Sequence, residues 1–488
     1  MTEHPPPRRS LAATIVDRSA ERPDLRLGTV DDQIELADAL AYAASRAREL
    51  QAWGLAPGQR VALVAPTSTD YLVTWMACLL AGLPVALVNP TYPGELIDRM
   101  LEPLEPALVL APEQIALARR SGRSGLEGLP GLEVDAFQVA SYMHTSGTTG
   151  APKFCAQTHD YFARMATAMS TALELTPADR VLAPLPLFHI NPMGYGVITA
   201  LLTGADALTV DKFSASNFWP TVVDEQISVL ILHAPPVEIL KRATTTEQAA
   251  GHCVRTMFYA DRDFLEQFGV PAAVSGYGST EAGGVSHLHR WNRATDDIPD
   301  DASRHGGTAR ADMQWRLDEH GIIFVREREH AALFDGYVRP DGLDAARDAE
   351  GWFDTGDLGR IEVRDDHSDS SGDAGHLVFL ERAAESIRVK GEFVPIPFVE
   401  NHLAAVDGIT DHALWKRKGA LVDEEVVLYA VADQLPLDRL RVRIAELPAF
   451  MRPAAAVRVA SLPRDAAAGK VQRRLLAELP VLEWVELS

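Results

Sequence analysis

The sequence predicts an α/β fold with a large N-terminal domain, made of α/β subdomains and a small β-rich subdomain, and a small C-terminal α/β domain. Strand and helix patterns alternate through the first half of the chain, which is typical of βαβ units and a mostly parallel sheet. From Gly306 onward the apolar period changes to two, which indicates the β-rich part. Strand and helix patterns start again over residues 393–432, so we divide the chain into domains at residues 1–382 and 383–488.

The elements expected before Tyr142 alternate between helix and strand. Ser68 or Thr69 can cap the second helix, because a short hydroxyl side chain accepts a hydrogen bond from an N–H group of the first turn. In order, we expect a helix at 36–53, a strand at 60–65, a helix at 71–79, a strand at 83–88, a helix at 93–101 and a strand at 107–110.

The elements expected after Thr158 continue this alternation and then give way to strands. They are a helix at 159–175, a strand at 181–185, a helix at 191–202, a strand at 229–232, a helix at 237–242, and strands at 257–259, 273–275, 313–317, 322–326 and 359–363. Residues 364–375 are polar and acidic, which predicts a solvated loop. Parallel sheets of this kind bind ligands at the carboxyl ends of their strands.

Length and composition restrict the class of protein. A chain of 488 residues is too long for one ordinary core, and 47% hydrophobic with 23% charged residues is typical of a folded globular protein. The 46 basic and 68 acidic residues give a formal charge of −22, which argues against DNA or RNA as a partner. An anionic substrate must therefore be bound by local positive charge.

Cysteine usage and apolar segments indicate a cytoplasmic protein. The three cysteines, Cys78, Cys155 and Cys253, have no C-x-x-C spacing, which argues against a disulfide framework and a zinc site. The N-terminal residues have no apolar core, so they do not form a secretory signal. The most apolar segment, Leu72 to Val88, is broken by Gly82 and Pro84, and we expect no membrane span.

The stretch from Tyr142 to Lys153 reads Y-M-H-T-S-G-T-T-G-A-P-K and follows an apolar run that is expected to be a strand. Glycines allow successive N–H groups to converge on an anion, hydroxyls add donors, and a lysine adds charge. We therefore expect a phosphate-binding loop, although its spacing is not that of a Walker A loop and a Gly-rich surface turn is the alternative. The phosphate-binding candidates are Thr145, Ser146, Gly147, Thr148, Thr149, Gly150 and Lys153.

This loop and four later motifs, in the same order, resemble the adenylate-forming (ANL) superfamily, which includes acyl-CoA synthetases, peptide-synthetase adenylation domains and luciferases. The later motifs are Gly276 to Glu281 (G-Y-G-S-T-E), Gly351 to Arg360 (G-W-F-D-T-G-D-L-G-R), Glu381 to Gly391, and Pro463 to Arg473 with Gly469-Lys470. The resemblance covers almost the whole chain. It implies the adenylate-forming enzyme fold with a mobile C-terminal lid, and an ATP-dependent acyl-CoA synthetase that uses Mg²⁺ and coenzyme A.

The resemblance also assigns roles to residues that match the motifs. Lys470 matches the lysine that bridges the attacking carboxylate and the α-phosphate, and Glu281 matches the glutamate that helps to bind magnesium. Asp357 matches the aspartate that accepts the ribose hydroxyls, with Arg382 near the ribose and Tyr277 against adenine. Thr280 and His189 join the catalytic candidates, Gly278 and Ser279 join the nucleotide candidates, and Lys390 and Gly391 lie in the segment expected near the thiol.

The acyl group is expected to contact residues that follow several strands. The substrate candidates are Asn191, Gly194, Tyr195, His233, Tyr259 and Gly283, together with Met193 and Gly284. Glycines at 194, 283 and 284 are expected to leave volume for the acid. No aspartate lies near His233 to pair with an amino group, which makes an amino-acid substrate less favoured than a simple carboxylic acid.

The sequence departs from the family pattern at two places. Ala384 replaces the usual hinge Asp or Lys, and Glu381 replaces a glycine, so the balance between the two lid orientations can be shifted. Phe258-Tyr259-Ala260 replaces a Gly-Gly-Ala segment beside the nucleotide and acyl group, and aromatic residues there resemble carnitine- and crotonobetaine-type CoA ligases.

These departures leave alternatives open. One is an enzyme of the same fold that loads a carrier-protein thiol, and another is an enzyme that transfers a preformed acyl-adenylate to CoA. A nucleotide sensor with a degenerate site is a third, which the joint presence of Lys470, Glu281 and Asp357 disfavours. We expect a monomer or a homodimer.

Overall fold

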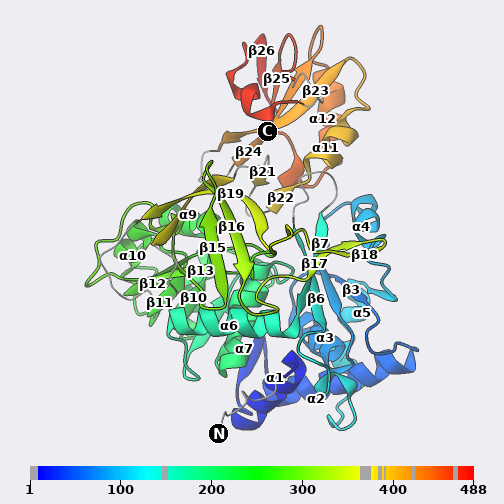
Figure 1. The fold of residues 1–488 in the computed structure, drawn as a ribbon, viewed down its shortest axis with the longest axis vertical. Coiled ribbons are helices and arrows are strands. Elements are labelled where there is room, and N and C mark those ends of the chain that lie inside the picture. The colour runs from blue at the N-terminus through cyan, green and yellow to red at the C-terminus, as the bar shows by residue number, and fades with distance from the viewer. Residues whose placement is uncertain are drawn as a thin grey trace. The chain divides into compact units, whose positions relative to one another are not determined.

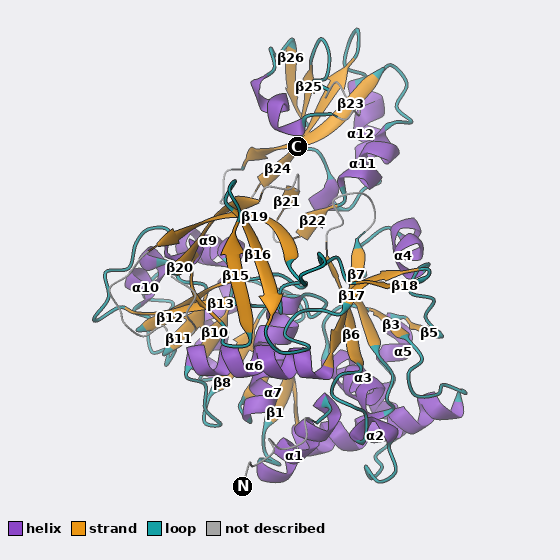
Figure 2. Cartoon of the chain, in the orientation of Figure 1, coloured by secondary structure: helices purple, strands orange, loops and turns teal. Residues whose placement is uncertain are grey.

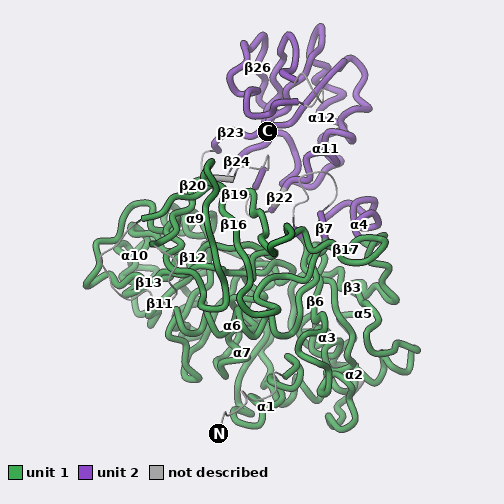
Figure 3. The backbone as a smooth tube through the Cα atoms, in the orientation of Figure 1, with its two compact units in different colours: residues 1–90, 101–144, 154–381 green, residues 91–100, 145–153, 382–488 purple. Residues whose placement is uncertain are grey.

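The computed structural model describes residues 9–145, 152–362, 375–382, 387–389, 392–419, 424–464 and 471–487. Its contacts divide the chain into two units (Figure 3). Unit 1 comprises Met1–Pro90, Leu101–His144 and Phe154–Glu381, and unit 2 comprises Thr91–Met100, Thr145–Lys153 and Arg382–Ser488. Movement of residues 383–488 as a lid stays a prediction.

Unit 1 contains a seven-stranded sheet in the order β18-β17-β7-β6-β4-β3-β5 (Figure 2). Its strands are β3 Val61–Val64, β4 Val85–Val88, β5 Leu108–Leu110, β6 Val139–Thr145, β7 Lys153–Thr158, β17 Gly336–Arg339 and β18 Gly342–Asp344. Strands β5, β3, β4 and β6 are parallel, which confirms the βαβ prediction. The predicted helices are α2 Leu36–Ala52 and α3 Thr69–Leu80, and Ser68 caps α3 by accepting the N–H of Tyr71 at 3.0 Å.

A second, 13-stranded sheet has the order β15-β16-β19-β20-β14-β13-β12-β11-β10-β8-β9-β1-β2. Its strands are β1 Arg26–Thr29, β2 Asp32–Glu35, β8 Arg180–Ala183, β9 Asp206–Thr209, β10 Val229–Ile231, β11 Thr256–Phe258, β12 Ala272–Tyr277, β13 His287–Asn292, β14 His305–Ala309, β15 Met313–Leu317, β16 Ile322–Glu327, β19 Phe353–Glu362 and β20 His376–Arg382. The expected β-rich part therefore continues the parallel sheet as antiparallel strands, because β13 pairs with both β12 and β14.

Helix α6, His159–Leu173, packs against β11, β12 and β13 (Figure 1). Tyr161, Met165 and Met169 are spaced four residues apart and are fully buried, so they share one buried face of the helix. The other helices of unit 1 are α1 Leu11–Glu21, α5 Pro112–Ile115, α7 Thr199–Thr203, α8 Ala215–Asp224, α9 Ala234–Ala243 and α10 Arg262–Phe268.

The helix expected at 191–202 differs from the prediction, because Asn191–Ile198 forms a π-helix and α7 follows it. Pro192 has no N–H to donate, and the backbone N–H of Thr199 bonds five residues back to the carbonyl of Gly194. The Thr199 hydroxyl donates to the same carbonyl at 2.8 Å. A Cβ on Gly196 would lie 2.4 Å from the Cβ of Ala183, so only glycine allows this helix to approach β8 so closely. Such wide turns are frequent at functional sites.

Unit 2 contains a four-stranded sheet, β23-β24-β25-β26, and a β21-β22 pair. Its strands are β21 Ile387–Val389, β22 Glu392–Val394, β23 Asp411–Lys418, β24 Glu424–Val431, β25 Ala455–Arg458 and β26 Glu483–Glu486, and its helices are α4 Gly94–Leu101, α11 Ile396–Leu403 and α12 Leu437–Ala445. Trp415, Val427 and Val457 belong to its core. Among the helices of the described residues, none combines the length and apolar composition needed to cross a bilayer.

Two buried histidines make the stability of unit 1 depend on pH. His159 accepts the N–H of Leu11 at its Nδ1, 3.2 Å away, and burial lowers the pKa of His159 to about 4. The ring of His287 is fully buried beside Trp315, and burial lowers the pKa of His287 to about 3. Below about pH 6.5 these two imidazoles are protonated in the unfolded chain but stay neutral in the folded chain. The free energy of unfolding therefore falls as pH falls from about 6.5.

We expect the free energy of unfolding to drop by about 2 kcal/mol per buried imidazole between pH 7 and pH 5. Urea unfolding followed by tryptophan fluorescence at both pH values measures this drop. His287→Asn removes one of the two titrating groups, so its pH dependence should be about half as steep. Equal pH dependence in the two proteins would show that His287 does not cause the effect.

Candidate active site at the carboxyl ends of the strands

Four parallel neighbours in the large sheet, β12, β11, β10 and β8, end at the same edge. Tyr277 ends β12, Tyr259 follows β11, His233 follows β10 after Leu232, and His189 lies in the segment that follows β8. Open α/β sheets bind ligands at this edge. The fold thus brings predicted residues from four separate segments to one edge.

Tyr277 and Asp357, the predicted adenine and ribose residues, form one hydrogen-bonded pair. The Tyr277 hydroxyl donates to Oδ2 of Asp357 at 2.9 Å. Asp357 is 3% exposed and comes from β19, which lies four positions from β12 in the sheet. The pair fixes the orientation of the carboxylate, and a fixed carboxylate is a suitable acceptor for a vicinal diol.

The Tyr277 ring is held from several sides. Phe379 of β20 stacks on it with ring centroids 5.9 Å apart, and His287 meets it edge-on at 5.9 Å. A Cβ on Gly306 would lie 2.9 Å from the Cβ of Tyr277, so a glycine there makes room for this packing. The predicted stacking of Tyr277 on adenine stays a prediction.

The segment 278–284 folds back on itself after β12. Ser279 accepts the N–H groups of Ala282 and Gly284 at its carbonyl, 3.1 and 2.9 Å away. A Cβ on Gly278 would lie 2.3 Å from the carbonyl oxygen of Gly284, which explains why glycine is required. The Tyr161 hydroxyl of α6 donates to the carbonyl of Thr280 at 2.9 Å and anchors the segment.

Glu281 connects this segment to the seven-stranded sheet. The Tyr337 hydroxyl donates to Oε1 of Glu281 at 3.0 Å, and Tyr337 lies opposite Cys155 in the β17–β7 pair. Strand β7 leaves the predicted phosphate loop. Tyr337 has no motif signal of its own, and only the pairing of β17 with β7 places it beside Glu281.

The surroundings of Glu281 fit a magnesium ion that arrives with a nucleotide. Across the part of the chain that the structure describes, no three His, Cys, Asp or Glu side chains form a cluster that could hold a metal. Magnesium commonly uses one or two carboxylates plus substrate phosphates and water. Glu281, half-buried and oriented by Tyr337, can supply one such carboxylate.

Replacing Tyr337 by Phe should weaken the use of Mg·ATP without unfolding the protein. The change removes the hydroxyl that orients Glu281, and a hydrogen bond to a charged group is worth about 1.5–3 kcal/mol. We therefore expect kcat/KM for Mg·ATP to fall about tenfold or more. Pyrophosphate release measured against magnesium concentration checks this, with Tyr429→Phe in the core of unit 2 as the matched control. Identical magnesium dependence in both variants would contradict the role.

The predicted acyl residues come together around the π-helix. The Asn191 amide donates to the carbonyl of Leu232 at 3.3 Å, and its Oδ1 is buried without a hydrogen-bond partner among the described residues. The Tyr195 hydroxyl donates to the carbonyl of Gly284 at 2.7 Å. The π-helix, the end of β10 and the segment 278–284 are thus joined by two hydrogen bonds.

One expectation about this region is wrong. Gly194, Gly283 and Gly284 do not leave open volume, because the protein's own side chains occupy the space beside them. A Cβ would lie 2.6 Å from Met165 Cε at Gly194, 2.3 Å from Met165 Sδ at Gly284, and 2.2 Å from Met313 Cε at Gly283. Contact of these residues with the acid stays a prediction.

The backbone of Tyr259 has a conformation that favours glycine. Its φ is +91°, which is rare for a bulky residue and costs about 1–3 kcal/mol. Burial raises the pKa of its hydroxyl, and a hydrogen bond with Ser303 opposes that rise. The hydroxyl of Tyr259 is therefore engaged with the turn at Ala302–Arg304.

His189 lies in a small aromatic cluster that includes a residue the sequence analysis did not single out. The ring of His189 meets Phe188 at 4.7 Å and His144 at 5.9 Å. His144 is 8% exposed and comes from the end of β6, immediately before the predicted phosphate loop. Its place inside the motif Tyr142 to Lys153 was the signal available for finding it.

Several predicted site residues lie outside the described residues. They are Ser146, Gly147, Thr148, Thr149, Gly150, Lys390, Gly391 and Lys470, together with Ala384 of the expected hinge. Thr145 and Lys153 are described as the ends of β6 and β7, and Arg382 as the last residue of the β20 backbone. Their roles stay predictions.

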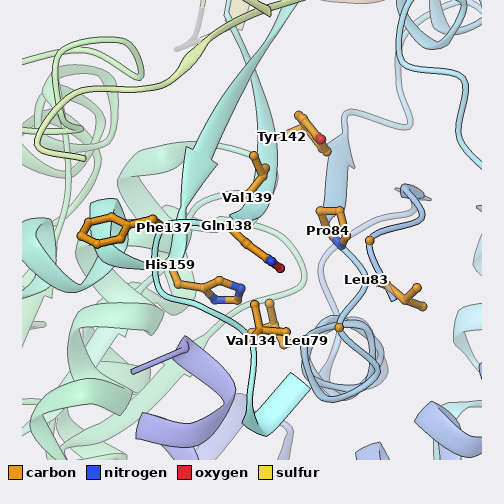
Figure 4. A pocket seen from close by; sticks show the side chains of 11 residues that line it. Leu79, Leu83, Pro84, Val134, Phe137, Gln138, Val139, Tyr142 and His159 are labelled. Carbon is orange, nitrogen blue, oxygen red and sulfur yellow. The ribbon is translucent and has the colours of Figure 1, made fainter. Parts of the chain in front are cut away.

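A separate cavity of about 270 Å³ opens at the amino end of β6 (Figure 4). Side chains from the end of α3, the start of β4 and the start of α6 surround it, and they include Leu79, Pro84, Val139, Tyr142 and His159. The predicted phosphate loop follows the carboxyl end of the same strand. This cavity is therefore not the predicted nucleotide site.

Comparison with protein families identifies the chain. Residues 17–327, more than half of its length, match the family described as AMP-binding enzyme. The chain belongs to this family.

Curated relatives of this AMP-binding family member include proteins named as CoA ligases and a human protein named long-chain fatty acid transport protein 1. A medium/long-chain-fatty-acid–CoA ligase, FadD6, from Mycobacterium tuberculosis is 26% identical over 81% of this chain and 72% of its own length. A 3-[(3aS,4S,7aS)-7a-methyl-1,5-dioxo-octahydro-1H-inden-4-yl]propanoyl:CoA ligase from Rhodococcus jostii is 27% identical, over 88% of this chain and 91% of its own length.

Solved structures show the same fold. A double mutant of o-succinylbenzoate CoA synthetase from Bacillus subtilis, bound to a product analogue, has a TM-score of 0.81 at 20% identity and covers 97% of this chain and 99% of its own. ATP-bound MatB from Rhodopseudomonas palustris has a TM-score of 0.64 at 22% identity and covers 96% of this chain and 98% of its own. The adenylate-forming enzyme fold predicted from the sequence is therefore confirmed.

Proposed function

We propose that this protein, an ATP-dependent acyl-CoA ligase of the AMP-binding family, joins a carboxylic acid to coenzyme A through an acyl-adenylate at the carboxyl edge of the large sheet. The observation that carries the proposal is the Tyr277–Asp357 pair, at 2.9 Å, beside the G-Y-G-S-T-E motif. The pair supports binding of the ribose and adenine, and Glu281 supports binding of the metal that accompanies the phosphates.

The first step forms the adenylate. A carboxylate oxygen of the acid attacks the α-phosphorus, the bond between that phosphorus and the bridging oxygen breaks, and pyrophosphate leaves. Both reactants are anions, so fixed donors and positive charge must stabilise the transition state. Thr280, Lys470 and the loop 145–153 would supply them, and Mg²⁺ held in part by Glu281 would neutralise phosphate charge.

The second step transfers the acyl group. The sulfur of CoA attacks the acyl carbon, the bond from that carbon to the phosphate oxygen breaks, and AMP leaves while the thiol proton passes to solvent. The segment that contains Lys390 and Gly391 would border the thiol. The names of the relatives support acids with largely apolar acyl groups.

A panel of carboxylic acids tests the proposal. We expect acid-dependent pyrophosphate release with ATP and magnesium, and AMP together with an acyl-CoA when CoA is added. Product formation only with a phosphopantetheinylated carrier protein would favour the carrier-loading alternative. Thioester formation from supplied acyl-AMP without any pyrophosphate release would favour the transfer-only alternative. Tight ATP binding without turnover of any acid would indicate a nucleotide sensor.

Two finer assignments belong to the same proposal. A place among the carnitine- or crotonobetaine-type ligases rests only on Phe258 and Tyr259, and the acid panel tests it directly. A cytoplasmic location rests on the cysteine usage.

A further inference from the structure

Met165 of α6 lies beside two glycines of the predicted acyl site, Gly194 and Gly284. Asn191 and His233 are half-buried, whereas Gly194 and Tyr195, one turn further along the π-helix, are buried. Met165 itself is 0% exposed. If the acyl chain enters at the half-buried Asn191, its inner end would lie near the buried Gly194 and therefore near Met165.

Met165 lies between two segments of the site at once. A Cβ on Gly194 would lie 2.6 Å from its Cε, and a Cβ on Gly284 would lie 2.3 Å from its Sδ. The terminal half of this thioether therefore fills the space beside both glycines. Met165 fills the volume that side chains at Gly194 and Gly284 would occupy, so the two glycines do not enlarge the acyl pocket.

Two aromatic side chains lie beside Gly284 and the π-helix as well. The Tyr195 hydroxyl donates to the carbonyl of Gly284 at 2.7 Å, so its ring spans from the π-helix to the segment 278–284. Phe258 meets the Tyr195 ring at 5.1 Å, and both side chains are 8% exposed. Met165, Tyr195 and Phe258 form a group that we call the acyl wall.

We propose that Met165 sets the length limit of the acyl group, so that the protein takes short or compact carboxylic acids. This inference rests on the proposed function, because it names the substrate class of the same site. Among the three residues of the acyl wall, Met165 is the one whose replacement by a smaller residue would open most space beside Gly194 and Gly284. It is unbranched and flexible, whereas Tyr195 is fixed by its hydroxyl.

The test compares Met165→Ala with Met169→Ala. Met169 lies one helical turn further along the same face of α6, is also 0% exposed, and has no contact with Gly194 or Gly284 among the nearest atoms to either glycine. Both changes remove the same atoms from the core, so both should lower the melting temperature. Only Met165→Ala should open the acyl site.

The probes are 5′-O-(N-acylsulfamoyl)adenosines that differ only in acyl length, from acetyl to decanoyl, with Kd measured by calorimetry. We expect wild type to bind the short members best and Met165→Ala to improve the ratio of decanoyl to acetyl affinity by about tenfold or more. Met169→Ala should keep the wild-type ratio. If Met165→Ala is too unstable to purify, Met165→Val provides the same comparison with a smaller shift.

Two results would overturn the inference: a wild-type preference for decanoyl over butanoyl, or equal length ratios in the Met165 and Met169 variants. The proposed function fails differently, with no analogue binding and no acid releasing pyrophosphate in the wild type. If Met165→Ala binds the analogues with the same length preference as wild type, Met165 does not set the length limit. The proposed ligase activity would not be affected by that result.

Discussion

Asp357→Asn is expected to lower kcat/KM for ATP in adenylate formation by about a hundredfold or more. The substitution keeps the size of the side chain and can still accept the Tyr277 hydroxyl, so the folded state should persist. It removes the negative charge and one of the two acceptor oxygens, so the side chain can no longer accept both hydroxyls of a vicinal diol. Acid-dependent pyrophosphate release at varied ATP concentration measures the loss.

Asp354→Asn is the matched control for this change. Asp354 lies on the same strand, β19, three residues earlier, and is exposed to solvent. We expect its kcat/KM for ATP to stay within about twofold of wild type, because surface substitutions of this kind are nearly neutral. Equal losses in the Asp354 and Asp357 variants would point to a general disturbance of β19 and against ribose recognition.

Tyr277→Phe separates orientation from recognition. Without the Tyr277 hydroxyl, Asp357 keeps its charge but loses the donor that fixes it. The loss in kcat/KM for ATP should therefore be smaller than for Asp357→Asn, about tenfold. A Tyr277→Phe loss as large as that of Asp357→Asn would show that the hydroxyl contributes more than positioning.

Sequence patterns predicted most elements of unit 1 because each pattern is local. The hydroxyl at Ser68 and the apolar face of α3 are both readable within a dozen residues. The antiparallel pairing of β17 with β7 is not local, because it joins residues 155 and 337. No pattern in either segment indicates the other, so Tyr337 was missed as a partner of Glu281.

In the site, too, the local motifs were predictable and the contacts between distant segments were not. Motif order led to Tyr277 and Asp357, but their hydrogen bond depends on the order of β12 to β19 in the sheet. The glycines at 194 and 284 were misinterpreted because a sequence does not show which side chain faces a missing Cβ. Met165 lies 29 residues before Gly194 and 119 before Gly284, and only the packing of α6 brings it to both.

Lys470→Ala is expected to reduce adenylate formation by about a hundredfold or more and to leave thioester formation from supplied acyl-AMP within a few-fold of wild type. The reason is the difference in charge between the two steps. In the first, an anionic carboxylate approaches an anionic α-phosphate, and a preorganised cation stabilises the transition state. In the second, the attacking atom is a thiol sulfur and the segment near Lys390 would border it.

Two separate assays measure the half-reactions, namely acid-dependent pyrophosphate release without CoA and acyl-CoA formation from synthetic acyl-AMP. Arg464→Ala is the matched control, because it removes a cation from the same C-terminal motif. Arg464 binds Asp411 at 2.9 Å within unit 2 and is substantially exposed, so both half-reactions should stay near wild type.

The overall charge of the protein makes this comparison informative. With a formal charge of −22, the protein as a whole repels ATP and the acid, so attraction must come from groups placed at the site, namely cations, N–H and hydroxyl donors and a bound metal. If general surface charge governed the rate, Lys470→Ala and Arg464→Ala would lose similar activity, and added salt would lessen the difference from wild type. If Lys470 acts at the reacting atoms, its loss is confined to the first half-reaction and persists at high salt. Equal loss of both half-reactions in Lys470→Ala would contradict the assignment of this lysine to adenylate formation alone.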